Sequence, residues 1–520
     1  MIQFISHNMA PLMFAGLVVG MVMGYPAAFS IGAVGLFFGL IGIELGLIPP
    51  IFLGNLTFQM FSVISNDLLL AIPFFTLMGA ILERCGLAED LLEGFGQLFG
   101  SLRGGLSYAV ILVGAVLGAI TGTVAGSVIA MGIISLPIML KYGYSVRHAT
   151  GVIAASGTIT QLIPPSLVLI VLADQMGKSV GDMYLGAIGP SLLQVALFAG
   201  WVFLLSIFRP NEVPALPPEA RTLHGWALAW KCIKGMVPSL VLIFLVLGTI
   251  FMGLATPTEA GAMGVVGALV LAAINRRLTW PLLCQGMEMT MRITAFVVCI
   301  LLGARVFSLV FQGVGGKEWV EGLLINLPGG VTGFLIVVNA IVFVLAFFLD
   351  FFEIAFIVIP LLAPVAEKLG IDLIWFGVLL CANMQTSFMH PPFGFALFYL
   401  RSIAPRDTVP TSDIYLGAIP WLFLQVLLVA IVIYWPGSVT YWLNKGPLVD
   451  PNTIEIRVPA FGGTGGPPSF GLPPGLSTPD LIAPPGGAPP AGLPAPAPGV
   501  TPGPAIELPK DLIPPEPKPN

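Results

Sequence analysis

The chain has 520 residues, of which 57% are hydrophobic and only 9% are charged, and its formal net charge is -5. Soluble globular proteins carry about 25% charged residues, so this composition excludes a soluble protein. Apolar stretches of about 20 residues recur along most of the chain, each long enough to cross a bilayer core of roughly 30 Å. Because these stretches are too long and too uniformly apolar for barrel strands, we predict an all-α polytopic membrane protein.

The sequence carries none of the motifs that indicate an enzyme. HExxH, GxSxG, GxGxxG and the P-loop pattern are absent, and the four histidines are dispersed. The five cysteines are scattered and form neither a CxxC pair nor a Cys/His cluster. We therefore expect a protein that is not an enzyme, has no cofactor and binds no nucleic acid.

Residues 1–10 form a short lead, and a first membrane region follows at 11–208. Within it, residues 118–137 read GAITGTVAGSVIAMGIISLP and are rich in glycine and threonine. Gly122 and Gly126 stand where a re-entrant turn could form. A packing face of small residues between two helices gives the same pattern, so both interpretations stay open.

The stretch QLIPPSLVLI at 161–170 interrupts an otherwise apolar helix with Pro164-Pro165. Proline lacks a backbone N–H and clashes with the preceding turn, so the pair predicts a helix break. The break exposes carbonyl oxygens, which suit a hard cation such as Na⁺, and starts a half-helix whose N-terminus suits a carboxylate. Hydroxyls that bond back to their own helix are the alternative. The polar residues just before the break are Ser156, Gly157, Thr158, Thr160 and Gln161.

Residues 209–237 form a polar linker and connection, and residues 238–435 then repeat the features of the first region. YLGAI occurs at 184–188 and again at 415–419, each time after a double proline. Gln194 corresponds to Gln425, and Pro137 corresponds to Pro360. Duplicated halves with helices interrupted at matching places are typical of secondary transporters, whose substrate site lies at the breaks near the bilayer midplane.

The second region repeats both features of the first. VLAFFLDFFEIAFIVIP at 344–360 corresponds to the glycine-rich segment, and it places Asp350 opposite Ser127. HPPFGFALFY at 390–399 holds the second double proline, Pro391-Pro392. The polar residues before this break are Asn383, Gln385, Thr386, Ser387 and His390.

Three charged residues lie deep in apolar sequence, where an unpaired charge costs several kcal/mol. Arg305 is the cation, and Asp350 and Glu353 are the anions. Either Arg305 forms a structural ion pair with one of these carboxylates, or it contacts an anionic substrate directly. Glu259 has a different reading, because Thr256-Pro257-Thr258-Glu259 fits a capping box at the start of a helix.

Residues 447–520 differ from the rest of the chain in composition. They are rich in proline and glycine and contain few residues that could build a core. We expect this tail to be disordered or partly polyproline II.

Several of these segments together resemble a known family. ASGTITQLIPPSLVLIVLADQMGKSVGDMYLGAIGP, GLATPTEAGAMG, FFLDFFEIAF and PPFGFALFYL resemble the large membrane subunit of TRAP transporters, the DctM type. The resemblance covers roughly residues 8–440. It implies a tripartite importer in the bacterial inner membrane, in which a periplasmic solute-binding protein delivers a carboxylate to this subunit and a small four-helix subunit. The resemblance also implies uptake driven by Na⁺ without ATP.

The resemblance implies two inverted repeats that work as an elevator, with re-entrant hairpins at about 118–140 and 344–367 and broken helices at about 146–177 and 371–402. It places Na⁺ between the hairpin tips and the breaks, with the substrate close by. The implied Na⁺ candidates are Thr121, Gly122, Thr123, Ser156, Gly157, Thr158, Asp350, Thr386 and Ser387. The substrate candidates are Ser127, Pro165, Ser166, Arg305, Glu353, Gln385 and Pro392.

Two departures from the family pattern matter. Many members carry an aspartate in the first hairpin where this chain has Ser127, and the proline-rich tail is unusual. No four-helix block precedes residue 11, so we expect the small subunit to be a separate chain. A stand-alone carboxylate carrier of related architecture is the alternative within transport. A membrane scaffold or an intramembrane enzyme is the alternative outside it.

Overall fold

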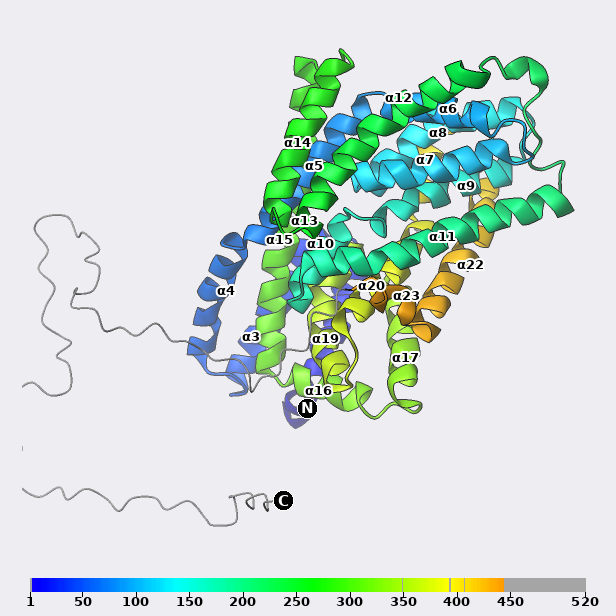
Figure 1. Ribbon diagram of the computed structural model, residues 1–520. Helices are drawn as coiled ribbons and strands as arrows, with labels where there is room; N and C mark the ends of the chain where they lie inside the picture. Colours follow the sequence, from blue (N-terminus) through cyan, green and yellow to red (C-terminus); the bar gives the residue numbers. More distant parts are fainter. Residues whose placement is uncertain (1, 348, 392–393, 406, 444–520) are drawn as a thin grey trace, which may run out of the picture. The chain divides into compact units, whose positions relative to one another are not determined.

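The computed structural model describes residues 2–347, 349–391, 394–405 and 407–443, and over these residues it contains helices and no strand (Figure 1). Within this part of the chain, seven helices are long and apolar enough to cross a membrane, or eight if one bent pair counts as a single span. The prediction of an all-α polytopic membrane protein is therefore confirmed. The tail predicted to be disordered lies outside the described residues.

The first half of the chain begins with helices that lead to the first hairpin and the first broken helix. Its elements are α1 (Ile2–His7), α2 (Met9–Val22), α3 (Ala27–Glu44), α4 (Asn55–Ile64), α5 (Ala71–Arg84), α6 (Leu87–Leu98), α7 (Gly105–Thr121), α8 (Val124–Lys141), α9 (Val146–Thr158), η3 (Ile159–Gln161), α10 (Leu167–Met176) and α11 (Val180–Phe208).

The second half follows the same order of elements. They are α12 (Gly225–Ile243), α13 (Thr249–Phe251), α14 (Pro257–Ile274), α15 (Trp280–Gly313), α16 (Gly316–Leu324), α17 (Gly330–Leu345), α18 (Phe351–Glu353), η6 (Ile354–Val358), α19 (Ile359–Lys368), α20 (Leu373–Met384), η7 (Gln385–Met389), α21 (Phe395–Ile403), α22 (Thr411–Tyr434) and α23 (Gly437–Thr440). One difference stands out: α15 is continuous, whereas its counterpart in the first half, the pair α4 and α5, bends by 46°.

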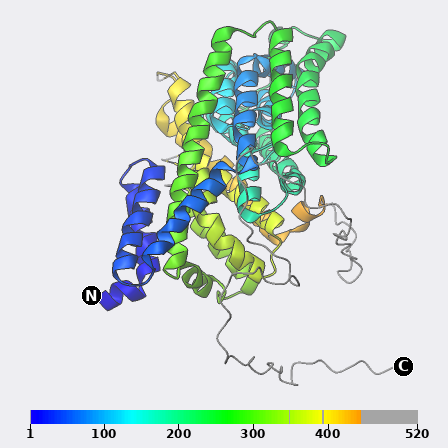
Figure 2. The same ribbon diagram turned by 90° about the vertical axis from the view of Figure 1, so that its left-hand side faces the viewer.

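Helices from the two halves pack directly against each other, with α3 against α15 and α5 against α14 and α15 (Figure 1). Figure 2 shows the green helices of the second half beside the blue helices of the first. Glycines permit the close approach of α3 and α15, because a Cβ on Gly35 would lie 2.9 Å from the Cα of Phe307. Small residues at such crossings are the usual means of helix association in lipid.

Two helical hairpins occupy matching positions in the halves. In the first, α7 and α8 are joined by Gly122 and Thr123, and the left-handed Gly122 (φ 60°) ends α7. In the second, α17 is joined through residues 346–350 to a continuous helical segment made of α18, η6 and α19. Both hairpins begin earlier than predicted, at Gly105 and Gly330, and in each a left-handed glycine, Gly104 (φ 77°) or Gly329 (φ 94°), precedes the first arm.

The two predicted helix breaks are present in the described residues, the first at Pro164-Pro165 and the second between Met389 and Phe395, and Pro392 lies outside those residues. The first broken helix runs through α9 and η3, stops before Pro164-Pro165 and resumes as α10. The second runs through α20 and η7 and resumes as α21. Segments far apart in sequence meet here, since α9 packs on α8 and α22, and α21 packs on α8. The breaks and the hairpin tips therefore lie in one region of the molecule.

Candidate functional site

A cavity of about 210 Å³ lies between the two hairpin tips and beside both helix breaks. Ile293 and Phe296 of α15 line one side of it. Pockets for drug-sized ligands measure about 300–1,000 Å³, so this volume suits a small ligand. The other residues that line the cavity are Gly122, Thr123, Val124, Ala125, Gln161, Leu167, Val168, Asp350, Phe351, Phe352, Phe388, Phe395 and Tyr399.

Four helices of the described chain direct their N-termini at this cavity, since the first residues of α8, α10, α18 and α21 all line it. At α8, α10 and α21 the N-cap residues Thr123, Ser166 and Gly394 make no side-chain cap hydrogen bond. The first N–H groups of a helix have no partner within the helix and carry the positive end of its dipole. The cavity therefore offers backbone donors suited to an anion.

The fourth N-terminus, that of α18, is capped by its own side chains. Asp350 Oδ1 accepts a hydrogen bond from the Phe351 N–H at 2.7 Å, and Glu353 Oε2 accepts one from the Asp350 N–H at 3.0 Å. This is a capping box. The sequence contained the signal, because Asp350 precedes Glu353 by three residues, but these carboxylates were predicted as ligands or as partners of Arg305 and not as helix caps. The capping box predicted at Thr256 and Glu259 is confirmed.

At the first break, the hydroxyl of Thr158 makes three hydrogen bonds. It donates to the Ala155 carbonyl at 2.8 Å, and it accepts from Gln425 Nε2 at 2.8 Å and from Gln385 Nε2 at 3.4 Å. A hydroxyl has one hydrogen and two lone pairs, so all three are engaged. Thr158 therefore joins the two halves of the chain through its hydroxyl in this arrangement.

The other polar residues of the first break differ in their contacts. Ser156 Oγ and Gln161 Oε1 are buried without a hydrogen-bond partner in the described part of the chain. Thr160 bonds back to the Gly157 carbonyl at 3.0 Å, and Ser166 donates to the Gln161 carbonyl. The hydroxyls thus divide between the back-bonding alternative and groups left available for a ligand.

Gly157 and Pro165 bring the first break against the first hairpin. A Cβ on Gly157 would lie 2.2 Å from Val128 Cγ2 and 3.1 Å from the Val128 backbone nitrogen, so α8 and α9 touch at this point. The Pro165 carbonyl lies 3.6 Å from a Cβ built on Gly122, which places it beside the hairpin tip. Ser127 is buried on α8, one turn beyond Thr123.

At the second break, Thr386 donates its hydroxyl hydrogen to the Asn383 carbonyl at 2.7 Å, and within the described residues its oxygen lone pairs accept no hydrogen bond. Ser387 and Gln385 are buried beside it. Asn383 donates to the Asn339 carbonyl at 2.8 Å and ties the break to α17. Of the remaining predicted residues, Pro392 and the side chain of Thr121 lie outside the described residues.

Arg305 and Glu353 are not brought together. Within the described residues Arg305 makes no ion pair, its Nε is buried without a partner, and it does not line the cavity. Glu353 faces its own capping box. Neither an ion pair between these two residues nor a contact of Arg305 with the cavity is present in this arrangement.

Sequence reasoning missed two polar residues near the site. Gln425 was identified only as the counterpart of Gln194 in the repeat. A side-chain amide in an apolar helix requires a hydrogen-bond partner, and in the structure that partner is Thr158. Glu83 of α5 lies directly against the first hairpin, since a Cβ on Gly126 would overlap its carboxylate oxygen. An acid at the end of an apolar helix was the available signal for this second contact.

A helical protein of many spans, in which two hairpin tips and two helix breaks enclose one cavity, is a membrane transport protein by its architecture. The family model for the "Tripartite ATP-independent periplasmic transporter, DctM component" matches residues 14–438. The chain belongs to this family, and it is the large permease subunit of a bacterial TRAP transporter, a multi-pass membrane protein and not an enzyme.

Individual relatives agree with this assignment. The C4-dicarboxylate TRAP transporter large permease protein DctM of Vibrio cholerae is 30% identical over 82% of this chain and 96% of its own length. The sialic acid permease SiaM of the same organism is 26% identical, over 73% of this chain and 86% of its own length. Among solved structures, the Alcanivorax borkumensis YdaH transporter matches with a TM-score of 0.50 at 16% identity, covering 75% of this chain and 88% of its own, which shows likeness of fold alone.

Proposed function

We propose that this chain imports a small carboxylate together with Na⁺, as the large membrane subunit of a tripartite transporter. The observation that carries the proposal is the convergence of uncapped helix N-termini on one cavity. Such N-termini bind carboxylates through backbone N–H groups without a basic side chain. The relatives named for C4-dicarboxylate and sialic acid support a carboxylate as the substrate class.

The charge balance of the cavity supports a coupling cation. Asp350 lines the cavity, and none of the described lining residues is lysine or arginine. An anionic substrate that enters beside Asp350 brings two like charges into a poorly solvated space, which costs free energy unless a cation compensates them. Na⁺ prefers oxygen ligands such as those offered by the two breaks and the hairpin tips.

The hydrogen bonds described above distinguish the predicted Na⁺ ligands whose side-chain oxygens are already engaged from those whose oxygens are not. The hydroxyl of Thr158 is already engaged, and Gly157 is a packing residue, so either would contribute through its backbone carbonyl. Candidates with free oxygen lone pairs are better placed. These are Ser156, Asp350, Thr386 and Ser387, with Gly122 and Thr123 at the tip of the first hairpin.

The substrate is expected at the helix N-termini. Ser166 and Pro165, which precede α10, and Ser127, near the start of α8, are close to those donors. Gln385 does not line the cavity, and its Oε1 has no hydrogen-bond partner in the described residues. Arg305 and Glu353 would reach the substrate only after a rearrangement of α15 or of the α18 capping box.

Movement of the cavity across the membrane is proposed to follow an elevator mechanism. Asn66, at the bend between α4 and α5, donates to Asp174 Oδ1 at 2.8 Å, and Asp174 lies near the end of α10. This contact joins the bent helix pair to the first broken helix. If the hairpins and broken helices slide as one body, this hydrogen bond breaks in each cycle.

The comparisons support a proposal for the protein partners. The family description names a tripartite, periplasmic system, and one relative is named as a permease DctMQ, of which the matched segment is 64%. We propose that this chain works in the bacterial inner membrane with a separate small four-helix subunit and a periplasmic binding protein.

Reconstitution tests the proposal. The full chain, its small subunit and its binding protein are placed in vesicles, and carboxylate uptake is measured with and without an inward Na⁺ gradient. Uptake that requires Na⁺ and all three components is expected. Uptake by the chain alone would indicate a stand-alone carrier, and uptake indifferent to Na⁺ would refute Na⁺ coupling.

A further inference from the structure

A second cavity, of about 680 Å³, opens between α11 and α22 over the start of α9, and we refer to it as the α11–α22 groove. It shares no lining residue with the transport cavity. Its floor includes Trp421, which packs edge-to-face on Phe198 at 5.1 Å. The groove is lined by Ser145, Arg147, His148, Trp201, Leu204, Leu205, Phe208, Arg209, Glu212, Leu416, Gly417, Ile419, Pro420 and Trp421.

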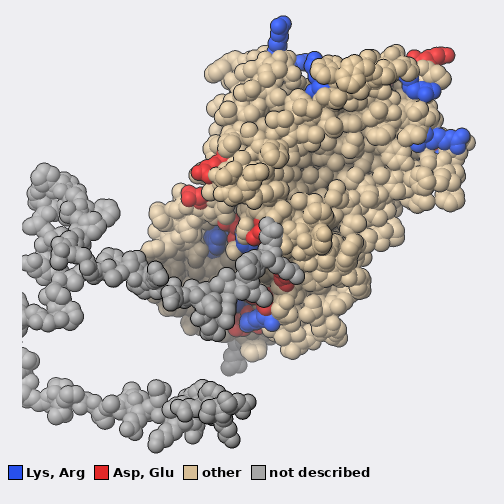
Figure 3. Space-filling view, viewed as in Figure 1, with Lys and Arg blue, Asp and Glu red and all other residues tan. Residues whose placement is uncertain are grey.

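The groove lies where helices end at one boundary of the membrane region. α11 ends at Phe208 and is followed by Arg209, α22 begins at Thr411, and α9 begins at Val146. The apolar walls continue onto the outer surface, since Leu204, Phe208 and Ile419 are 45%, 77% and 50% exposed. Figure 3 shows a broad face without charged side chains, with charges gathered toward its edges. In a membrane protein, exposed apolar side chains of this kind face acyl chains, so the walls of the groove suit the chain of a lipid.

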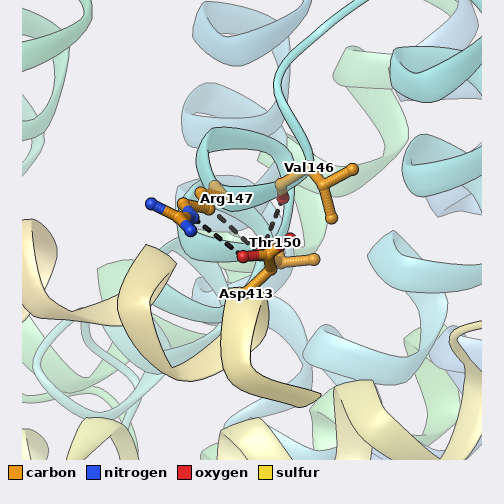
Figure 4. A network of polar contacts seen from close by, with 4 residues as sticks. All are labelled: Val146, Arg147, Thr150 and Asp413. Atoms are coloured by element: carbon orange, nitrogen blue, oxygen red, sulfur yellow. Dashed lines mark hydrogen bonds and ion pairs between the residues drawn. The ribbon is translucent and has the colours of Figure 1, made fainter. Parts of the chain in front are cut away.

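The rim of the groove carries two ion pairs. Arg147 Nε lies 2.8 Å from Asp413 Oδ1 (Figure 4), and Arg209 Nη1 lies 3.1 Å from Glu212 Oε1. The two arginine side chains are 59% and 68% exposed, and exposed ion pairs of this kind contribute only about 0–1 kcal/mol. Both guanidinium groups are therefore free to turn toward another anion at little cost.

We propose that the α11–α22 groove binds one membrane phospholipid with a zwitterionic, primary-amine head group, the phosphatidylethanolamine type. Guanidinium groups bind phosphate oxygens in bidentate fashion, so Arg147 and Arg209 hold the phosphate. Asp413 and Glu212 accept hydrogen bonds from the ammonium. An acyl chain lies along Trp201, Leu204 and Leu416.

Charge complementarity selects this head group. The rim holds two cations and two anions, so it has no net charge to favour an anionic lipid. A quaternary choline cannot donate hydrogen bonds to the two carboxylates, whereas a primary ammonium can donate three. The groove thus matches a head group that has one phosphate and one hydrogen-bonding ammonium.

Native mass spectrometry of the full chain, extracted in mild detergent, tests the proposal. The protein is exposed to an equimolar mixture of phosphatidylethanolamine, phosphatidylcholine and phosphatidylglycerol, and the lipids it retains are counted. We expect at least threefold enrichment of phosphatidylethanolamine in the wild type. The variant Arg147→Ala/Arg209→Ala should lose at least tenfold of that retention. The control Arg103→Ala, which alters an exposed arginine elsewhere, should retain it fully.

A second measurement separates lipid binding from altered folding. A photo-crosslinking residue at Leu204 should capture phosphatidylethanolamine, and Leu416→Trp should block capture without changing the elution volume or melting temperature. Equal retention by the double arginine variant, preference for phosphatidylglycerol, or capture of the small subunit in place of lipid would each overturn the proposal.

Discussion

The hydrogen bonds at Thr158 predict a coupling between the two halves of the chain that can be measured. Thr158→Val keeps the shape of the side chain but removes the acceptor for Gln425 Nε2 and Gln385 Nε2. Both glutamines are buried, at 1% and 0% exposure, so water does not replace the lost partner. An unsatisfied buried polar group costs about 1–3 kcal/mol.

The size of the effect follows from which bonds are lost. The 2.8 Å bond from Gln425 is the strong one, whereas the 3.4 Å bond from Gln385 is near the limit of a hydrogen bond and adds little. We therefore expect Thr158→Val to lower the free energy of unfolding by about 1–3 kcal/mol. Gln425→Leu should cost a similar amount, and the double variant should cost clearly less than the sum.

The assay is a double-mutant cycle on the free energy of unfolding, measured by denaturant titration in mixed micelles. Interhelical hydrogen bonds in membrane proteins average about 0.6 kcal/mol of coupling with a maximum of about 1.7, which sets the expected range. Thr160→Val is the matched control, because within the described residues the Thr160 hydroxyl bonds only to the Gly157 carbonyl of its own broken helix. A coupling energy of zero between Thr158 and Gln425 would refute the reasoning.

Three further predictions rest on other contacts. Gly157→Ala should destabilise the protein by about 1–3 kcal/mol, since its Cβ would overlap the neighbouring hairpin, whereas Gly200→Ala, with open space around it, should be neutral or stabilising in a thermal melt. Thr386→Val should raise the Na⁺ concentration for half-maximal uptake severalfold with normal expression, and an unchanged Na⁺ titration would remove Thr386 from the ligands. Cysteines at Asn66 and Asp174, joined by a short bifunctional reagent, should stop uptake reversibly while leaving Na⁺-dependent substrate binding intact; uptake that continues would count against sliding at this contact.

The features that the sequence predicted correctly all involve residues with strong local effects on the backbone. Pro164-Pro165 breaks its helix, the second broken helix ends just before Pro391, and Thr256 with Glu259 caps a helix from four residues alone. A mean composition this apolar also leaves no alternative to membrane helices. Each of these effects depends on only a few neighbouring residues, so it can be predicted from the sequence without knowledge of the tertiary structure.

The partners of polar side chains could not be read in the same way. Gln425 and Thr158 are 267 residues apart in sequence. Asp350 was expected as a Na⁺ ligand, and Arg305 was expected to pair with Asp350 or Glu353 or to contact the substrate. In the structure both carboxylates form the capping box at the start of α18, and within the described residues Arg305 makes no ion pair. Which of several permitted partners a buried polar group takes depends on where two helices cross, and periodicity does not encode that position.

The converging helix ends have a consequence for how such a cavity diverges in evolution. Backbone N–H groups are the same for every amino acid except proline, so point substitutions around α8, α10 and α21 leave those donors in place. Under the proposed function, most substitutions therefore leave the binding of the substrate carboxylate unchanged, whereas substitutions at Phe296, Phe388 or Tyr399 change the shape of the rest of the cavity. The same fold can therefore accept a different substrate through changes in the side chains that line the cavity, while the helix N-termini stay the same.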